Sequence, residues 1–236
     1  MILPNVRASL GPRELSFLVG ALSGGSSAGR ARVAARLADE GLDRLLDDPR
    51  TLDAVMGGGI SAAPLELVCY LMIRRALLDC DIDDRTLADY LAALLVDFSA
   101  SDRRVQQAKD FTYLVDVVAE IQQAGQGRAF ELHAYLGEYS LWMSGVFPDR
   151  IVARVHRRGA PGLGYWEEMG IAGYTTAAGC RQAGDLGVNR LYRDCAERFP
   201  ELRVALNRVS DKYLFPTGAP SVDRLLRQIA AEFGQR

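Results

Sequence analysis

The spacing of apolar residues constrains this chain more than any other feature of its sequence. From end to end, apolar residues recur three and four positions apart, which places them on one face of an α-helix. The clearest stripe consists of Leu87, Leu91, Leu94, Leu95 and Phe98. No segment shows the sustained alternation of apolar and polar residues that is typical of a half-buried strand. The sequence therefore predicts an all-α protein, a compact bundle of roughly ten helices.

The segment from 64 to 78 is predicted to be the central helix of this bundle, because it is apolar almost all round. It carries Glu66, Arg74 and Arg75, and it is shorter than the roughly 20 apolar residues that a bilayer span requires. We therefore expect a helix buried among other helices, and no membrane span.

The chain has 236 residues, which is enough for one large domain with a sizeable core. A single helical domain over 1–236 is one interpretation. The polar stretch from 99 to 104 is the best candidate boundary, so two intimate halves, 1–100 and 105–236, are the alternative.

Charge and cysteine content narrow the class of protein. The formal net charge of -2 provides no general field that would attract nucleic acid or anionic lipid. No two of the four cysteines have the CxxC spacing. We expect all four to be reduced thiols. The first residues lack the basic flank and apolar run of a signal peptide. These features predict a soluble, cytoplasmic protein.

An aspartate-rich segment, 79–84, imitates the start of a calcium-binding loop. Such a loop needs glycine at position six and glutamate at position twelve, where this chain has Asp84 and Tyr90. We interpret the segment as a helix end, with Asp83 capping the next helix.

A glycine- and serine-rich segment, 24–30, imitates a phosphate-binding loop. Arg30 and Ala31 replace the lysine and the serine or threonine that such a loop requires. We interpret it as a link in which Ser26 or Ser27 caps the following helix. The sequence also lacks zinc and di-iron patterns, so we predict neither a metal nor a cofactor.

One region differs from the rest in composition. Both histidines, both tryptophans and four of the nine tyrosines lie between residues 133 and 174. On the helix expected from 129 to 146, carboxylates and aromatic rings alternate along one face. A second segment, 164–180, begins with aromatic and acidic residues. The candidate ligand-binding residues are Glu131, His133, Tyr135, Glu138, Trp142, Trp166 and Glu167.

Small residues in the second segment, among them Gly170 and Gly173, have two explanations. They can permit close packing against the small residues of the first helix, which include Gly137. They can instead form the floor of a pocket. Packing is the favoured explanation, because glycine inside a helix usually has a packing reason.

A short helix expected between these segments, from 148 to 158, carries an arginine stripe. The candidate anion-binding residues are Arg150, Arg154, Arg157 and Arg158. Such a stripe can bind phosphate, carboxylate or nucleic acid. More often it is a solvated face that pairs with carboxylates, here Glu167 and Glu168, and we expect that pairing. The near-neutral net charge disfavours nucleic acid.

Three functional hypotheses follow. We favour a non-enzymatic helical binding protein with a protein partner or a second copy as its target, since no catalytic set is recognisable. The first alternative is an enzyme or small-molecule binder with a carboxylate and aromatic pocket in residues 131–174, where paired carboxylates divide acid and base roles. The second is polyanion or nucleic-acid binding through Arg150 to Arg158. The sequence does not show whether residues 131–174 converge on one pocket.

Overall fold

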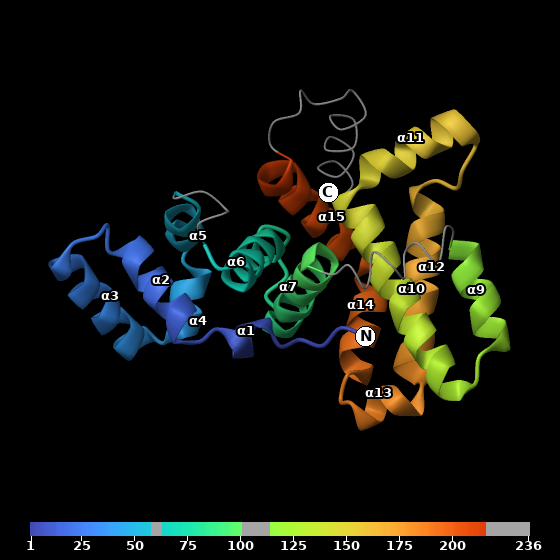
Figure 1. The fold of residues 1–236 in the computed structure, drawn as a ribbon, viewed down its shortest axis with the longest axis horizontal. Coiled ribbons are helices and arrows are strands. Elements are labelled where there is room, and N and C mark those ends of the chain that lie inside the picture. Colours follow the sequence, from blue (N-terminus) through green and yellow to red (C-terminus); the bar gives the residue numbers. More distant parts are fainter. Residues whose placement is uncertain (58–62, 101–113, 216–236) are drawn as a thin grey trace. The chain divides into compact units, whose positions relative to one another are not determined.

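The computed structural model describes residues 1–57, 63–100 and 114–215 (Figure 1). Every regular element in these ranges is helical: there are 14 α-helices and one π-helix, with no strand. The predicted all-α class is therefore confirmed. The chain divides into two compact units, residues 2–101 and, together with Met1, residues 102–236, and each unit is described by itself.

The unit of residues 2–101 is organised around a buried helix, α6, which contacts four other helices of the unit, α1, α4, α5 and α7. From Leu67 to Leu77 every residue except Arg75 is buried, which confirms the predicted central apolar helix. The helices of this unit are α1 (Val6–Ser9), α2 (Pro12–Leu22), α3 (Ser27–Glu40), α4 (Leu42–Asp47), α5 (Pro49–Met56), α6 (Leu65–Leu78) and α7 (Arg85–Ala100).

The unit of residues 102–236 is organised around α10, which contacts α9, α11, α12 and α15. Helix α12 also packs on α14, so the described core of this unit is formed by α10, α12, α14 and α15. Its elements are α9 (Leu114–Gln123), α10 (Gln126–Val146), α11 (Pro148–Arg158), α12 (Leu163–Gly179), α13 (Arg181–Asp185), α14 (Asn189–Glu197), α15 (Phe199–Val209) and the π-helix η2 (Ser210–Leu214).

Glycines allow α10 and α12 to approach at backbone distance. A methyl group on Gly173 would lie 2.7 Å from the backbone nitrogen of Gly137 and 2.8 Å from the carbonyl oxygen of His133. A methyl group on Gly170 would overlap the ring of Phe199. The contacts of these glycines support the packing explanation that was favoured from the sequence.

Side-chain caps begin several helices. Ser26 accepts a hydrogen bond from the backbone N–H of Gly29 at 3.0 Å and caps α3, as expected. The cap of α7 is Asp84, which accepts from the backbone N–H groups of Thr86 and Leu87 at 2.8 and 2.9 Å. The prediction that Asp83 is this cap was wrong, because Asp83 pairs with a buried arginine.

The N-cap of α5 makes the unit of residues 2–101 sensitive to acid. Hydrogen bonds from Arg50, with a further contribution from Arg36, lower the pKa of Asp48 from 3.8 to about 2. Because the folded pKa is lower than the unfolded one, this carboxylate stabilises the fold above about pH 4, and the contribution is lost as the pH falls to about 2.

We therefore expect the urea midpoint of the wild-type chain, followed by circular dichroism, to fall more steeply between about pH 4 and pH 2 than that of Asp48→Asn. The asparagine retains a capping oxygen but does not titrate. Equal slopes in the two proteins would show that Asp48 does not contribute to the acid response.

Candidate functional site

Both tryptophans belong to one aromatic cluster in the unit of residues 102–236. The rings of Tyr135 and Tyr139 are stacked, with centroids 5.6 Å apart and an interplanar angle of 7°. The ring of Tyr139 also lies 6.0 Å from Trp142 and 5.9 Å from Trp166. Three predicted site residues thus meet around Tyr139, which the sequence analysis did not select. Tyr139 lies four residues after Tyr135 and three before Trp142, so its helical spacing could have identified it in the sequence.

The aromatic cluster continues from the core to the surface. The rings of Trp142 and Phe147 pack in a T-shaped arrangement with centroids 4.9 Å apart, and the ring centroids of Phe147 and Phe215 are 5.6 Å apart. Tyr139, Trp142 and Phe147 are half-buried, whereas Phe215, which directly follows η2, is 43% exposed. Aromatic side chains from the end of α10, the start of α11 and the end of η2 are therefore accessible in part.

Two arginines of the predicted stripe lie beside these rings. The guanidinium of Arg150 sits over the ring of Phe147, 5.0 Å from its centroid. Burial raises the pKa of the Tyr139 phenol, and the positive charges of Arg154 and Arg150 oppose that rise, so both arginines are close enough to act on it. We call the side chains of Tyr139, Trp142, Phe147, Phe215, Arg150 and Arg154 the aromatic–arginine surface.

No carboxylate of the described residues neutralises the arginine stripe of α11. Arg150, Arg154, Arg157 and Arg158 are all exposed, and none has an ion pair with any carboxylate in the described part of the chain. Glu167, which was expected to pair with the stripe, instead accepts a hydrogen bond from Arg203 of α15 at 2.5 Å. The pairing of the stripe with Glu167 was therefore wrong.

Glu167 belongs to a hydrogen-bond chain that supports the end of α10. The guanidinium of Arg203, held by Glu167, donates to Asn207 at 3.2 Å. The amide of Asn207 then donates to the carbonyl oxygens of Ser144 and Gly145 at 3.0 and 2.6 Å. The last carbonyls of a helix have no partner within the helix, so Asn207 provides one from another element. Glu167 therefore has a structural role, because it holds the arginine that supports the end of α10.

The same end of α10 receives a second side chain. The hydroxyl of Ser210, at the start of η2, donates to the carbonyl oxygen of Val146 at 2.7 Å. Together these bonds fix the point at which α10 ends and α11 begins, directly beside Phe147. The supporting residues Arg203, Asn207 and Ser210 carry no local motif, so the sequence analysis missed them.

The other predicted carboxylates and the histidine are distributed along α10. Glu131 is exposed and lies 3.3 Å from Arg128, which also binds Glu120 of α9 at 2.8 Å. His133 is half-buried, its Nδ1 has no hydrogen-bond partner among the described residues, and burial lowers its pKa. Glu138 is fully buried. Glu131 and Glu167 thus form ion pairs with two different arginines, and they do not form a carboxylate pair with each other.

Neither a metal site nor a membrane-spanning helix is found among the described residues. In residues 1–57, 63–100 and 114–215, no group of three or more histidine, cysteine, aspartate or glutamate side chains is placed to hold a metal ion. Within the same ranges, none of the helices combines the length and the apolar character needed to cross a membrane.

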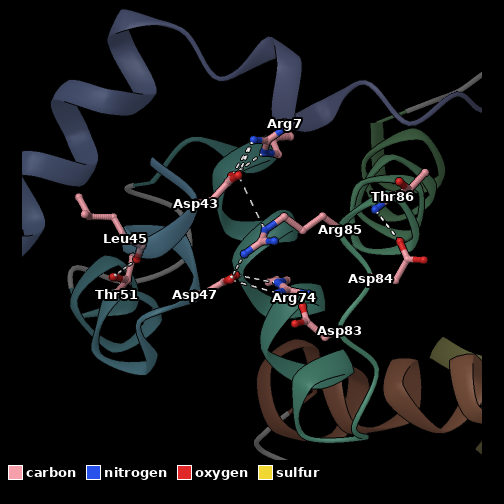
Figure 2. Close-up of polar contacts among 10 residues, drawn as sticks. All are labelled: Arg7, Asp43, Leu45, Asp47, Thr51, Arg74, Asp83, Asp84, Arg85 and Thr86. Atoms are coloured by element: carbon pink, nitrogen blue, oxygen red, sulfur yellow. Dashed lines mark hydrogen bonds and ion pairs between the residues drawn. The ribbon is translucent and has the colours of Figure 1, made fainter. Parts of the chain in front are cut away.

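An ionic cluster joins α1, α4, α6 and α7 in the unit of residues 2–101 (Figure 2). At its centre Arg74, which is 1% exposed, contacts Asp47 at 2.7 Å and Asp83 at 2.5 Å. The cluster explains how a helix as apolar as α6 holds an arginine, because two carboxylates compensate its charge. Its members, alternating in charge, are Arg7, Asp43, Arg85, Asp47, Arg74 and Asp83.

The segment that imitates a calcium-binding loop therefore has a structural role in this unit. Asp83 pairs with Arg74, and Asp84 caps α7. Figure 2 shows these two aspartates, which are neighbours in sequence, directed to different partners. These contacts explain why both positions carry an aspartate.

Comparison of the chain with protein-family models, with curated proteins and with solved structures finds no match.

Proposed function

We propose that the protein is a non-enzymatic binding protein that recognises a protein partner through the aromatic–arginine surface. The observation that supports this is the presence of half-buried aromatic rings beside arginines that form no ion pair with a carboxylate of the described residues. Tryptophan, tyrosine and arginine dominate the binding energy of many protein interfaces. Their rings and aliphatic stems bury a large area, while their polar ends form directional bonds.

The surface is held in place before any partner binds, which favours affinity because less side-chain freedom is lost on binding. Trp142 is fixed by contacts with Tyr139 and Phe147. Arg150 is placed by α11, whose first residue is Pro148 and therefore suits a helix start. The carbonyl bonds from Asn207 and Ser210 hold the end of α10.

The catalytic alternative has less support. Its premise is that carboxylates share an apolar pocket and divide acid and base roles, whereas Glu131 and Glu167 pair with Arg128 and Arg203.

A second copy of the chain is one partner that the binding hypothesis includes. The cytoplasmic location expected from the sequence stays a prediction.

Site-specific photocrosslinking in the cells that make the protein tests this function. The photoreactive residue p-benzoyl-phenylalanine replaces Phe215 in one variant and Leu186 in the control. These two side chains are 43% and 46% exposed and belong to the same unit. We expect a discrete protein adduct at Phe215, identified by mass spectrometry, and none at Leu186. Absence of a protein adduct at Phe215, or the same adducts at both positions, would contradict the proposal.

A further inference from the structure

We infer that the partner presents an acidic segment to this surface, with carboxylates interspersed among apolar side chains. This inference depends on the proposed function and names the chemistry of the partner. It rests on two observations. The arginines of the surface have no carboxylate partner in the described residues, and the aromatic rings already contact one another and Arg150.

The positive charge of α11 is not compensated by any carboxylate of residues 1–57, 63–100 and 114–215, which favours an acidic partner. Helix α11 carries four arginines and a single acidic residue, Asp149, in 11 residues. The nearby carboxylate that was expected to neutralise it, Glu167, is bound to Arg203. Arginine forms planar, two-pronged hydrogen bonds with carboxylates, so a segment rich in aspartate or glutamate complements this helix.

The spacing of the two arginines nearest the rings limits the geometry of the segment. Arg150 and Arg154 are four residues apart on α11, and a rise of about 1.5 Å per residue separates them by about 6 Å along the helix. Carboxylates four apart on a helix have the same separation, and those two apart on an extended chain have about 6.6 Å. The acidic segment is therefore expected to show one of these spacings.

The rings supply the apolar part of the recognition. Phe215 is the most accessible of the four aromatic side chains, and Trp142 and Phe147 are half-buried beside it. Apolar side chains of the segment can cover these rings while its carboxylates reach Arg150 and Arg154. This combination of a buried aromatic centre with charges around it is typical of protein interfaces.

The contacts among the rings favour protein over single-stranded nucleic acid. Binding of bases to a protein surface uses aromatic faces on which the bases stack. One face of Tyr139 is stacked on Tyr135, and one face of Phe147 is covered by Arg150. The net charge of -2 also gives no general attraction for a phosphate backbone.

The first part of the test is the identity of the crosslinked segment. Peptide sequencing of the adduct at Phe215 is expected to find a segment of another protein with net negative charge and the spacing given above. A neutral or basic segment, nucleic acid, a second copy joined through a segment that is not acidic, or residues 216–236 of the same chain would overturn the inference. Absence of any protein adduct would instead be a failure of the proposed function.

The second part measures binding of the purified partner to the full chain. The variant Arg150→Glu/Arg154→Glu is expected to bind at least about tenfold more weakly, because both favourable charge pairs become repulsive. The neutral variant Arg150→Gln/Arg154→Gln should show a smaller loss.

The matched control is Arg193→Glu/Arg198→Glu, in the same unit, where both arginines are exposed and have no ion pair in the described residues. This control should change affinity less than about twofold, the effect of a surface charge outside the interface. Equal affinity of all four proteins, with unchanged circular dichroism, would overturn the acidic segment while the binding function stands.

Discussion

Replacing Asp47 with alanine is expected to lower the free energy of unfolding of residues 2–101 by about 3–5 kcal/mol, because a buried charge loses its main partner. Arg74 donates two hydrogen bonds to Asp47, at 2.7 and 3.1 Å, and is 1% exposed. Burial lowers the pKa of Arg74, but the hydrogen bonds to Asp47 and Asp83 outweigh this effect and raise it above the ordinary value. Without Asp47, the carboxylate that remains beside Arg74 in the described residues is Asp83, whose side chain is 74% exposed.

The matched control for this substitution is Asp43→Ala, one turn earlier on α4. Asp43 pairs with Arg7, and the two side chains are 36% and 41% exposed, so its loss should cost less than about 1 kcal/mol. Native-state hydrogen exchange of the α6 amides measures both effects, and it is needed because both tryptophans lie in the other unit. Equal losses from the two substitutions would show that Arg74 does not depend on Asp47.

Replacing Gly173 with alanine is expected to lower the free energy of unfolding of residues 102–236 by about 1–3 kcal/mol through overpacking. The added methyl group would meet the backbone of α10, at the nitrogen of Gly137 and the carbonyl oxygen of His133. Backbone atoms cannot yield by a change of rotamer, so the two helices must separate. Alanine normally brings a gain of up to about 1 kcal/mol to a helix, which offsets part of this cost and places the net loss in the lower part of the range.

Gly179→Ala, at the last position of the same helix, separates the two effects. Apart from its own chain neighbours and the adjacent backbone of α12, no heavy atom lies within 4 Å of a methyl group placed there, so we expect no loss and a gain of at most about 1 kcal/mol. Urea unfolding followed by tryptophan fluorescence reports on this unit, which contains Trp142 and Trp166. If both alanine variants were as stable as the wild-type chain, close packing of α10 on α12 would not explain Gly173.

Local physical chemistry explains which parts of the fold could be predicted. An apolar stripe records which face of a helix is buried, and α6, apolar almost all round, is buried almost all round. Ser26 caps α3, as predicted, because it accepts a hydrogen bond from a backbone N–H only three residues away. These interactions lie within a few residues of one another, so the sequence reveals them directly.

The candidate site could be predicted only in part. Tyr135 and Trp142 were found because they lie on one helix at helical spacing. Their contact with Phe215 through Phe147 depends on where η2 ends, which no local pattern indicates. The same is true of Arg203, whose partner Glu167 is 36 positions away.

Taken alone, the sequence determined the helical class, the buried faces, several helix starts and the region where aromatic and arginine residues gather. The tertiary structure decided which charges are compensated. Asp83 and Asp84 are adjacent and chemically identical, yet one neutralises Arg74 and the other caps α7. Helical periodicity is a property of neighbouring residues, whereas the partner of a charged side chain depends on which distant helix packs against it. Within the part of the chain that the structure describes, the arginines of α11 have no carboxylate partner for that reason, and the proposed binding site depends on them.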